Sequence, residues 1–153
     1  WDIREVKQSF VYWSHFRGGS SFKDFDVYVD SKIASGAPGE TCSGFVFRTT
    51  SRDWDKGAYT FSVCNNSYFR VDYTQEEWEE ISGWIYSSVI QDSDWNRLEI
   101  SARGDHFNFI INNEVVFEMT DERLTKGGVA LLVEVREEKP VTIWFDNFGL
   151  QPR

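Results

Sequence analysis

Apolar and polar side chains alternate with a period of two residues along most of this chain. The clearest example lies near residues 24–34, where one face of the pattern consists of Phe25, Val27, Val29 and Ile33. Successive side chains of a β-strand point to opposite faces, so this pattern predicts strands that are buried on one side. The acidic stretch 75–81 around Trp78 has no wide apolar stripe, which predicts a surface turn or a short helix.

Turn-forming residues divide the alternating pattern into many short segments. We expect strands near residues 9–13, 24–34, 41–49, 58–65, 67–74, 84–86, 96–103, 106–111, 114–120, 128–135 and 141–150. Asn112 and Asn113 are expected to close a two-residue hairpin, because asparagine tolerates the positive φ angles of such turns. Many short strands at this spacing predict an all-β sandwich or barrel.

The inward-facing positions of these strands predict the hydrophobic core. They are Phe25, Val27, Val29, Phe45, Phe47, Phe61, Val63, Leu98, Ile100, Phe107, Phe109, Val129, Leu131 and Phe145. Aromatic residues make up 17% of the chain and include 7 Trp, which is more than one core easily accommodates. Trp95 is expected to be buried, and other indoles are expected to be exposed as platforms for a ligand.

Length and charge limit the classes of function. The 153 residues suit a single domain covering 1–153, and no apolar run approaches the roughly 20 residues of a membrane-spanning helix, so no membrane insertion is expected. The formal net charge of −9 argues against nucleic acid and anionic lipid as partners, because both are bound chiefly by Lys and Arg. The chain begins at Trp1 rather than Met, and we expect it to be part of a longer exported protein with other domains.

Several segments, in order along the chain, carry the residues of a known family. They are FDVYV at 25–29, GFVFR at 44–48, WNRLEISARGD at 95–105, IINNEVV at 110–116, GGVAL at 127–131 and FDNF at 145–148. This ordered set resembles concanavalin A-like lectin and glucanase domains, and among them the 3-keto-disaccharide hydrolase-like domains and the levan-binding type of carbohydrate-binding module. The resemblance implies a two-sheet antiparallel jelly-roll sandwich in an exported bacterial protein. It implies architecture rather than activity, because this fold hosts enzymes, lectins and adhesion modules.

The two cysteines lie in neighbouring predicted strands. If the aromatic residues of both strands face the core, one hairpin register pairs Phe47 with Tyr59 and, on the opposite face, Cys42 with Cys64. Cysteines directly opposite each other on antiparallel strands lie within reach of a disulfide. We therefore expect either a Cys42–Cys64 disulfide, which suits an exported protein, or two reduced thiols in a shifted register.

The aromatic residues that the alternation does not place in the core lie mainly in two loops, 50–57 and 75–86. Polar neighbours surround Trp54 and Trp78 on both sides, and Trp84 lies in the second loop. We expect the loops to approach each other and to line a shallow surface, because flat aromatic rings stack on the C–H faces of sugars. The polar side chains expected to orient hydroxyl groups there are Arg48, Asp53, Asp55 and Arg70.

Patterns for catalysis or metal binding are weak. His15 and His106 have no sequence neighbour at the spacing of a catalytic triad or a metal site. The carboxylates of the strand near 24–34 do not have the spacing of the paired acids in sandwich glycosidases. Asp146 is expected to accept backbone hydrogen bonds, with a structural calcium site as the alternative. No other cofactor is expected.

The sequence thus predicts a non-catalytic ligand-binding module that binds a poly- or oligosaccharide in an extracellular or cell-surface protein. A glycoside or keto-disaccharide hydrolase domain is the first alternative. A structural or protein-interaction domain is the second, because exposed tryptophans also bind proteins. Exposed aromatics on a shallow surface favour sugar binding, whereas a deep pocket with converging histidine and carboxylates favours an enzyme.

Overall fold

The structure is a computed structural model that describes residues 10–15, 21–50 and 56–153. These ranges contain strands and no helix, so none of their elements is a helix that could span a membrane. The strands are β1 (Phe10–His15), β2 (Phe25–Ser35), β3 (Thr41–Thr49), β4 (Ala58–Cys64), β5 (Tyr68–Thr74), β6 (Trp78–Glu80), β7 (Ile85–Tyr86), β8 (Asn96–Arg103), β9 (His106–Ile111), β10 (Glu114–Thr120), β11 (Gly128–Val135) and β12 (Thr142–Pro152).

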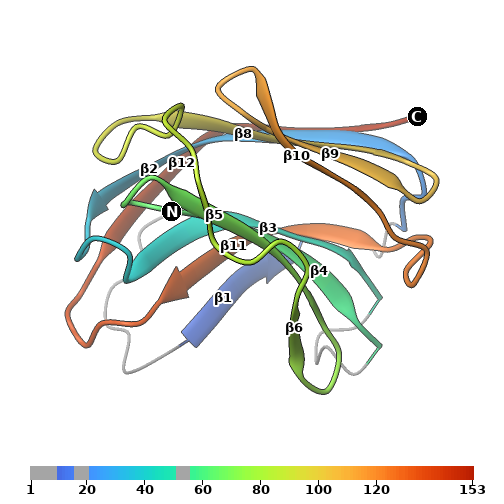
Figure 1. Cartoon of the computed structure of the whole chain (residues 1–153), viewed down its shortest axis with the longest axis horizontal. Helices are drawn as coiled ribbons and strands as arrows, with labels where there is room; N and C mark the ends of the chain where they lie inside the picture. Colours follow the sequence, from blue (N-terminus) through green and yellow to red (C-terminus); the bar gives the residue numbers. More distant parts are fainter. Residues whose placement is uncertain (1–9, 16–20, 51–55) are drawn as a thin grey trace.

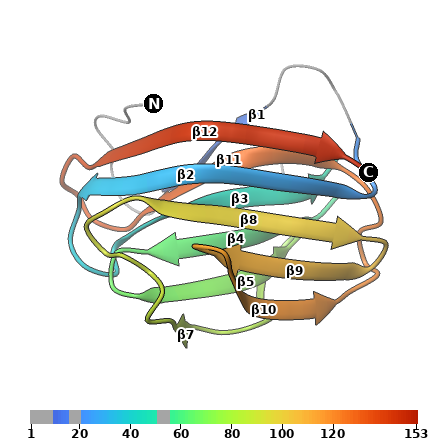
Figure 2. The ribbon, with the colours of Figure 1, turned by 90° about the horizontal axis from the view of Figure 1, so that it is seen from above.

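The strands form two antiparallel sheets that pack face to face, as Figures 1 and 2 show. The seven-stranded sheet has the order β1-β11-β3-β4-β5-β6, and β7 pairs with β5 beside β6. The five-stranded sheet has the order β10-β9-β8-β2-β12. Strands from both halves of the chain alternate between the sheets, which is the jelly-roll arrangement that the sequence predicted.

The core lies between the inner faces of the two sheets. Every predicted core residue is buried except Leu131 and Phe145, which are half-buried. Phe145 lies on the edge strand β12, and Leu131 lies on β11 next to the edge strand β1. Aromatic rings join the sheets, since the ring of Phe47 lies 5.6 Å from that of Phe107 and 5.9 Å from that of Phe109.

The strand registers confirm the predicted hairpins. β3 and β4 pair Phe47 with Tyr59 and Cys42 with Cys64, and the two cysteines form a disulfide with Cα atoms 4.0 Å apart. Asn112 and Asn113 close the turn between β9 and β10 with φ angles of 51° and 69°. Turn residues and alternation therefore fixed these registers, because a shift by one residue would turn the buried face outward.

Two local predictions were wrong. The acidic stretch that was predicted to be a turn or short helix contains β6, in which Trp78 pairs with Thr74 and Glu80 with Asp72. The backbone N–H and C=O groups at the edge of β5 pair with those of this stretch. The side-chain pattern of a polar stretch does not predict such backbone pairing. Trp95, which was predicted to be buried, is exposed on the outer face of the five-stranded sheet.

Candidate functional site

The outer face of the seven-stranded sheet has small side chains in its middle. Val46, Ala58, Ala130 and Leu132 form a buried apolar cluster there. Gly44 packs so closely on the backbone of Phe61 that its position has no room for a Cβ atom. In Figure 1 the sheet is bowed, and its edge strands β1 and β6 are displaced to the side away from the second sheet. Longer side chains from β5 and β11 extend over this face.

Two arginines, a glutamate and a tryptophan form the centre of the candidate site. Arg70 of β5 donates a 2.9 Å hydrogen bond from Nη2 to Glu134 Oε1 of β11, and Arg136 Nε donates a 2.9 Å bond to the same oxygen. The Cζ atoms of Arg70 and Arg136 lie 4.6 Å and 5.2 Å from the centre of the Trp84 ring. These cation–π contacts and ion pairs hold both guanidinium groups in place.

Further aromatic side chains surround this centre and are exposed to solvent. Trp78 is 49% exposed, and the Arg70 Cζ atom lies 5.8 Å from the centre of its ring. Tyr68 and Tyr86 are opposite each other on β5 and β7, with ring centres 5.7 Å apart. We call the set Arg70, Trp78, Trp84, Glu134 and Arg136 the aromatic–arginine cluster. It combines exposed ring faces with fixed hydrogen-bonding groups.

Asp72 lies beside the cluster and has an unusual environment. It is buried on β5, and the Nε atom of Arg70 lies 3.0 Å from its Oδ2 atom without pointing its N–H at that oxygen. Within the described part of the chain, neither carboxylate oxygen of Asp72 accepts a hydrogen bond. Burial raises the pKa of Asp72 to about 6; the positive charge of Arg70 opposes this rise, and Glu134 adds to it. The carboxyl group therefore changes its charge in a mildly acidic range.

Of the predicted site residues, the structure brings Arg70, Trp78 and Trp84 together. Asp53, Trp54 and Asp55 lie outside the described residues. Gly57, at the end of the same predicted loop, lies close to β5, because a Cβ atom at this position would lie 2.8 Å from the Tyr73 hydroxyl. That hydroxyl donates a 2.9 Å hydrogen bond to Gln75.

Arg48 is not part of this surface, which corrects its predicted role. It is the extra residue of a bulge opposite β11, with a φ angle of 56°, and its side chain is fully buried over Phe107. Its guanidinium donates 2.6 Å hydrogen bonds to the carbonyl oxygens of Lys23, Gly104 and Leu124. Arg48 therefore joins loops at one end of the sandwich and cannot orient a ligand.

Sequence reasoning missed Glu134, Arg136 and Asp72. Strand alternation places Glu134 and Asp72 on the outward face of β11 and β5, but β4 and β3 separate these strands in the sheet. Only the sheet order shows that Arg70 can reach Glu134 across the small side chains between them. One signal for these residues was present in the sequence, namely a charged side chain at an outward position of a largely apolar strand, as at Asp72 and Glu134.

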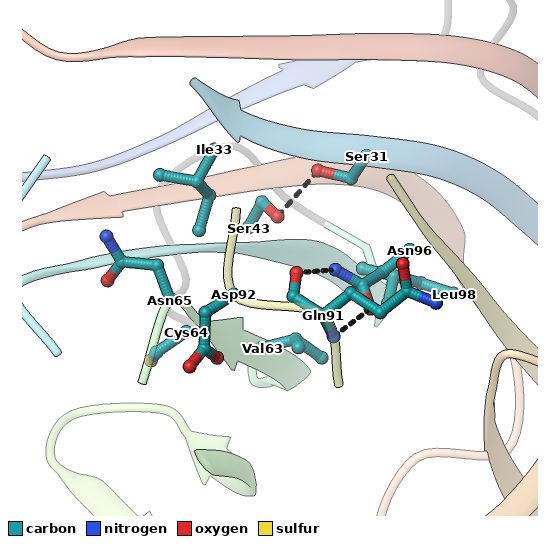
Figure 3. Close-up of a pocket in the computed structure, with 10 residues that line it drawn as sticks. All are labelled: Ser31, Ile33, Ser43, Val63, Cys64, Asn65, Gln91, Asp92, Asn96 and Leu98. Atoms are coloured by element: carbon teal, nitrogen blue, oxygen red, sulfur yellow. Dashed lines mark hydrogen bonds between the residues drawn. The ribbon is translucent and has the colours of Figure 1, made fainter. Parts of the chain in front are cut away.

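A small pocket lies between the sheets at their other end (Figure 3). Ser31 and Ser43 share a 2.7 Å hydrogen bond in its wall, and Asn96 binds both backbone polar groups of Gln91 at 2.8 Å. Leu98 and Val63 contribute the apolar part of the lining. These polar groups bind one another, and the hydrogen bonds of Asn96 to Gln91 fix the loop before β8.

The described ranges do not show a cluster of metal ligands. They contain no group of three or more His, Cys, Asp or Glu side chains that could hold a metal ion, so calcium stays a prediction without identified ligands. Asp146 is exposed and accepts a 2.8 Å hydrogen bond from the backbone N–H of Asn147. His106 is exposed at the start of β9, and the side chain of His15 lies outside the described part.

The two packed antiparallel sheets define a jelly-roll β-sandwich. A family model matches residues 12–151, and the chain belongs to the family of 3-keto-alpha-glucoside-1,2-lyase-like domains. This membership confirms the family that the sequence motifs indicated. No curated protein sequence matches the chain.

Solved structures share the fold at low sequence identity. The carbohydrate binding module CBM66 from Bacillus subtilis has a TM-score of 0.74 and 20% identity, covering 95% of this chain and 83% of that one. A putative glycosyl hydrolase from Parabacteroides distasonis has a TM-score of 0.59 and 18% identity, covering 95% and 84%. Sheep galectin-11 has a TM-score of 0.58 and 10% identity, covering 95% and 99%.

Proposed function

We propose that this chain is a carbohydrate-binding module whose ligand lies on the aromatic–arginine cluster. The observation that carries the proposal is the exposure of the Trp78 and Trp84 rings beside two arginines that are already fixed by Glu134. A sugar ring has apolar C–H faces and a rim of hydroxyl groups. Indole faces stack on the first, and fixed charged groups hydrogen-bond the second.

The arrangement of this cluster favours binding over a deep catalytic pocket. Its rings lie on the outer face of a sheet, and its arginines keep their positions through contacts within the protein. Pre-organised side chains lose little conformational entropy when a ligand binds, so even a shallow surface can hold a sugar. The fold shared with a carbohydrate binding module and with galectins is consistent with this proposal.

We further propose that the module is exported and attached to other domains of a cell-surface or secreted protein. The Cys42–Cys64 disulfide supports this location, because disulfides persist in oxidising compartments and are rare in the cytosol. A structural calcium ion is a further expectation, and loss of stability on adding a chelator would support it.

The second candidate function is lyase or hydrolase activity on a keto-disaccharide, in keeping with the family. Asp72 is the observation that favours it. A buried carboxyl group with a pKa of about 6 is suited to general acid–base catalysis near neutral pH. Arg70 and Glu134 lie next to it and would position a substrate.

Affinity electrophoresis and calorimetry with levan, neutral β-glucan and arabinoxylan test the binding function. Trp78→Ala and Trp84→Ala are expected to weaken binding about tenfold or more, because the parts of their rings that are exposed in the free protein become buried in the complex. Val115→Ala on β10, at an equally exposed apolar position, is the control. Wild-type binding by both Trp variants would place any sugar site elsewhere.

Incubation with a 3-keto-α-glucoside distinguishes the two candidates. A binding module leaves the substrate intact, whereas an enzyme releases free sugars. If products form, Asp72→Asn is expected to abolish their formation while the protein remains folded. Product formation that survives this substitution would contradict the role of Asp72 as a catalytic acid or base.

A further inference from the structure

A second pair of exposed indoles lies on the outer face of the other sheet. Trp95 precedes β8 and Trp144 lies on β12, and they are 37% and 48% exposed. Their ring centres are 6.4 Å apart and their planes differ by 38°. The two rings thus form one continuous aromatic surface that the function proposed above does not use.

The strand registers explain how two indoles so distant in the sequence meet. Trp144 pairs with Lys32 of β2, and Asn96, next to Trp95, pairs with Ser31. Strands β8 and β12 are therefore separated by β2, a distance of about 10 Å between their backbones. Rings only 6.4 Å apart must lean toward each other over the Lys32 side chain.

Charged groups that can bind hydroxyls lie at the rim of this pair. The Lys32 Nζ atom lies 3.7 Å from Asp94 Oδ1, and the Asp94 side chain is 64% exposed. The exposed Asp146 lies two residues beyond Trp144 on the same strand. Carboxylates accept hydrogen bonds from hydroxyl groups and repel anions, so this rim suits a neutral polyhydroxylated ligand.

The rest of the same face argues against a protein partner. Several of its charged residues are already paired with one another, as in the bonds of Arg103 to Asp26 at 2.8 Å and of Arg97 to Asp30 at 3.2 Å. A protein interface would bury these pairs, and the cores of interfaces are depleted in charged residues. A sugar covers only the two rings and leaves the pairs in water.

We propose that Trp95 and Trp144 form a second carbohydrate-binding platform, specific for a neutral sugar unit of a polysaccharide. This platform and the aromatic–arginine cluster lie on the outer faces of opposite sheets, so one molecule engages two polysaccharide chains. The platform has its own residues and does not depend on the cluster, whereas the engagement of two chains rests on the function proposed above.

The test uses the full chain and a Trp78→Ala background that weakens the first site. Trp144→Ala and Trp95→Ala are each expected to lower affinity for levan or neutral β-glucan about tenfold, measured by calorimetry. Asp94→Asn keeps both rings and is expected to weaken binding less. Val115→Ala, on the same sheet, is the control. Unchanged affinity for all these polysaccharides in both Trp variants would overturn the proposal.

Two further readouts separate this platform from the first site. The wild type is expected to cross-link and precipitate a neutral polysaccharide that it binds, and either Trp78→Ala or Trp144→Ala is expected to prevent this. Loss of binding with Trp144→Ala but not with Trp78→Ala would support the platform and contradict the first site. Stronger retention by polygalacturonate than by neutral chains would overturn the assignment to neutral sugars.

Discussion

Thr60 and Asp72 are direct partners across β4 and β5, and both are buried on the outer face of the sheet. In the described part of the chain, neither the Thr60 hydroxyl nor the Asp72 carboxylate has a hydrogen-bond partner. A buried polar group without a partner costs roughly 1–3 kcal/mol, and a charged one costs more. The native fold therefore retains next to the aromatic–arginine cluster a buried hydroxyl without a hydrogen bond and a buried carboxylate that is held only by its ion pair with Arg70, among the described residues.

The first prediction concerns the pH dependence of stability through Asp72. Its pKa is raised to about 6 in the folded protein, above the ordinary value of about 4 in the unfolded chain. Between these values the folded state binds more protons than the unfolded state, so the contribution of Asp72 to stability falls as pH rises from about 4 to about 6. Above about pH 6 the decrease in the free energy of unfolding due to Asp72 is complete and no longer changes with pH, at about 2–3 kcal/mol.

Urea denaturation of the wild type and of Asp72→Asn, at intervals between pH 4 and pH 8, measures this effect. The difference in the free energy of unfolding isolates Asp72 from other carboxyl groups, such as Asp26 and Asp121, whose pKa values are lowered. The wild type should lose stability relative to the variant as pH rises. A difference that is constant with pH would show that Asp72 is not perturbed.

The second prediction concerns the buried Arg48. Arg48→Met is expected to lower the free energy of unfolding by at least about 3 kcal/mol, because the carbonyl oxygens of Lys23, Gly104 and Leu124 lose their donor. Arg97→Met, at a partly exposed ion pair, should cost about 1 kcal/mol or less. If chemical denaturation shows the same loss of stability for Arg48→Met and Arg97→Met, the structural role proposed for Arg48 is contradicted.

The third prediction concerns the Cys42–Cys64 disulfide. It closes a loop with a sequence separation of 22, for which the loss of unfolded-chain entropy corresponds to about 3 kcal/mol. A reducing agent should therefore lower the thermal midpoint of the wild type. The double variant Cys42→Ala/Cys64→Ala should be less stable from the start and insensitive to the reagent. A wild type that does not respond to complete reduction would contradict the predicted contribution.

The fourth prediction tests the aromatic core. Phe109 is fully buried, and its ring lies 5.1 Å from that of Phe61 in the opposite sheet. Phe109→Ala should cost about 3–5 kcal/mol, because it leaves a cavity between the sheets. Val115→Ala, on the neighbouring strand but exposed, should change stability by less than about 0.5 kcal/mol. A loss below about 1 kcal/mol for Phe109→Ala would contradict its place in the core.

Much of the fold could be predicted because its causes are local. The alternation that puts Phe45 and Phe47 on one face of β3 set which face packs against the other sheet, and that face set the register with β4. This register places Cys42 opposite Cys64, which was one of the two predicted alternatives. The candidate site was predicted only in part, since Trp78, Trp84 and Arg70 come from neighbouring strands and their loop.

The missed features depend on contacts across several strands. A tryptophan such as Trp95 suits both a core and a surface position, and only the packing of β2 between β8 and β12 brings Trp95 to Trp144. Arg48 was predicted to orient a ligand, because it is a polar side chain close in sequence to the loop 50–57. The bulge in β3 turns the Arg48 side chain toward the core, where three backbone carbonyl oxygens accept the hydrogen bonds that its guanidinium would otherwise donate to water.

The sequence by itself determined the all-β class, most strand boundaries and the faces that point to the core, because a period of two and turn residues act within a few positions of each other; it left the disulfide as one of two alternatives. The tertiary structure decided which outward-facing side chains meet. Glu134 lies beside Arg70 only because sheet order places β11 and β5 around the small residues of β3 and β4. Sheet order is set by the packing energy of the whole core, which no short segment of the chain encodes.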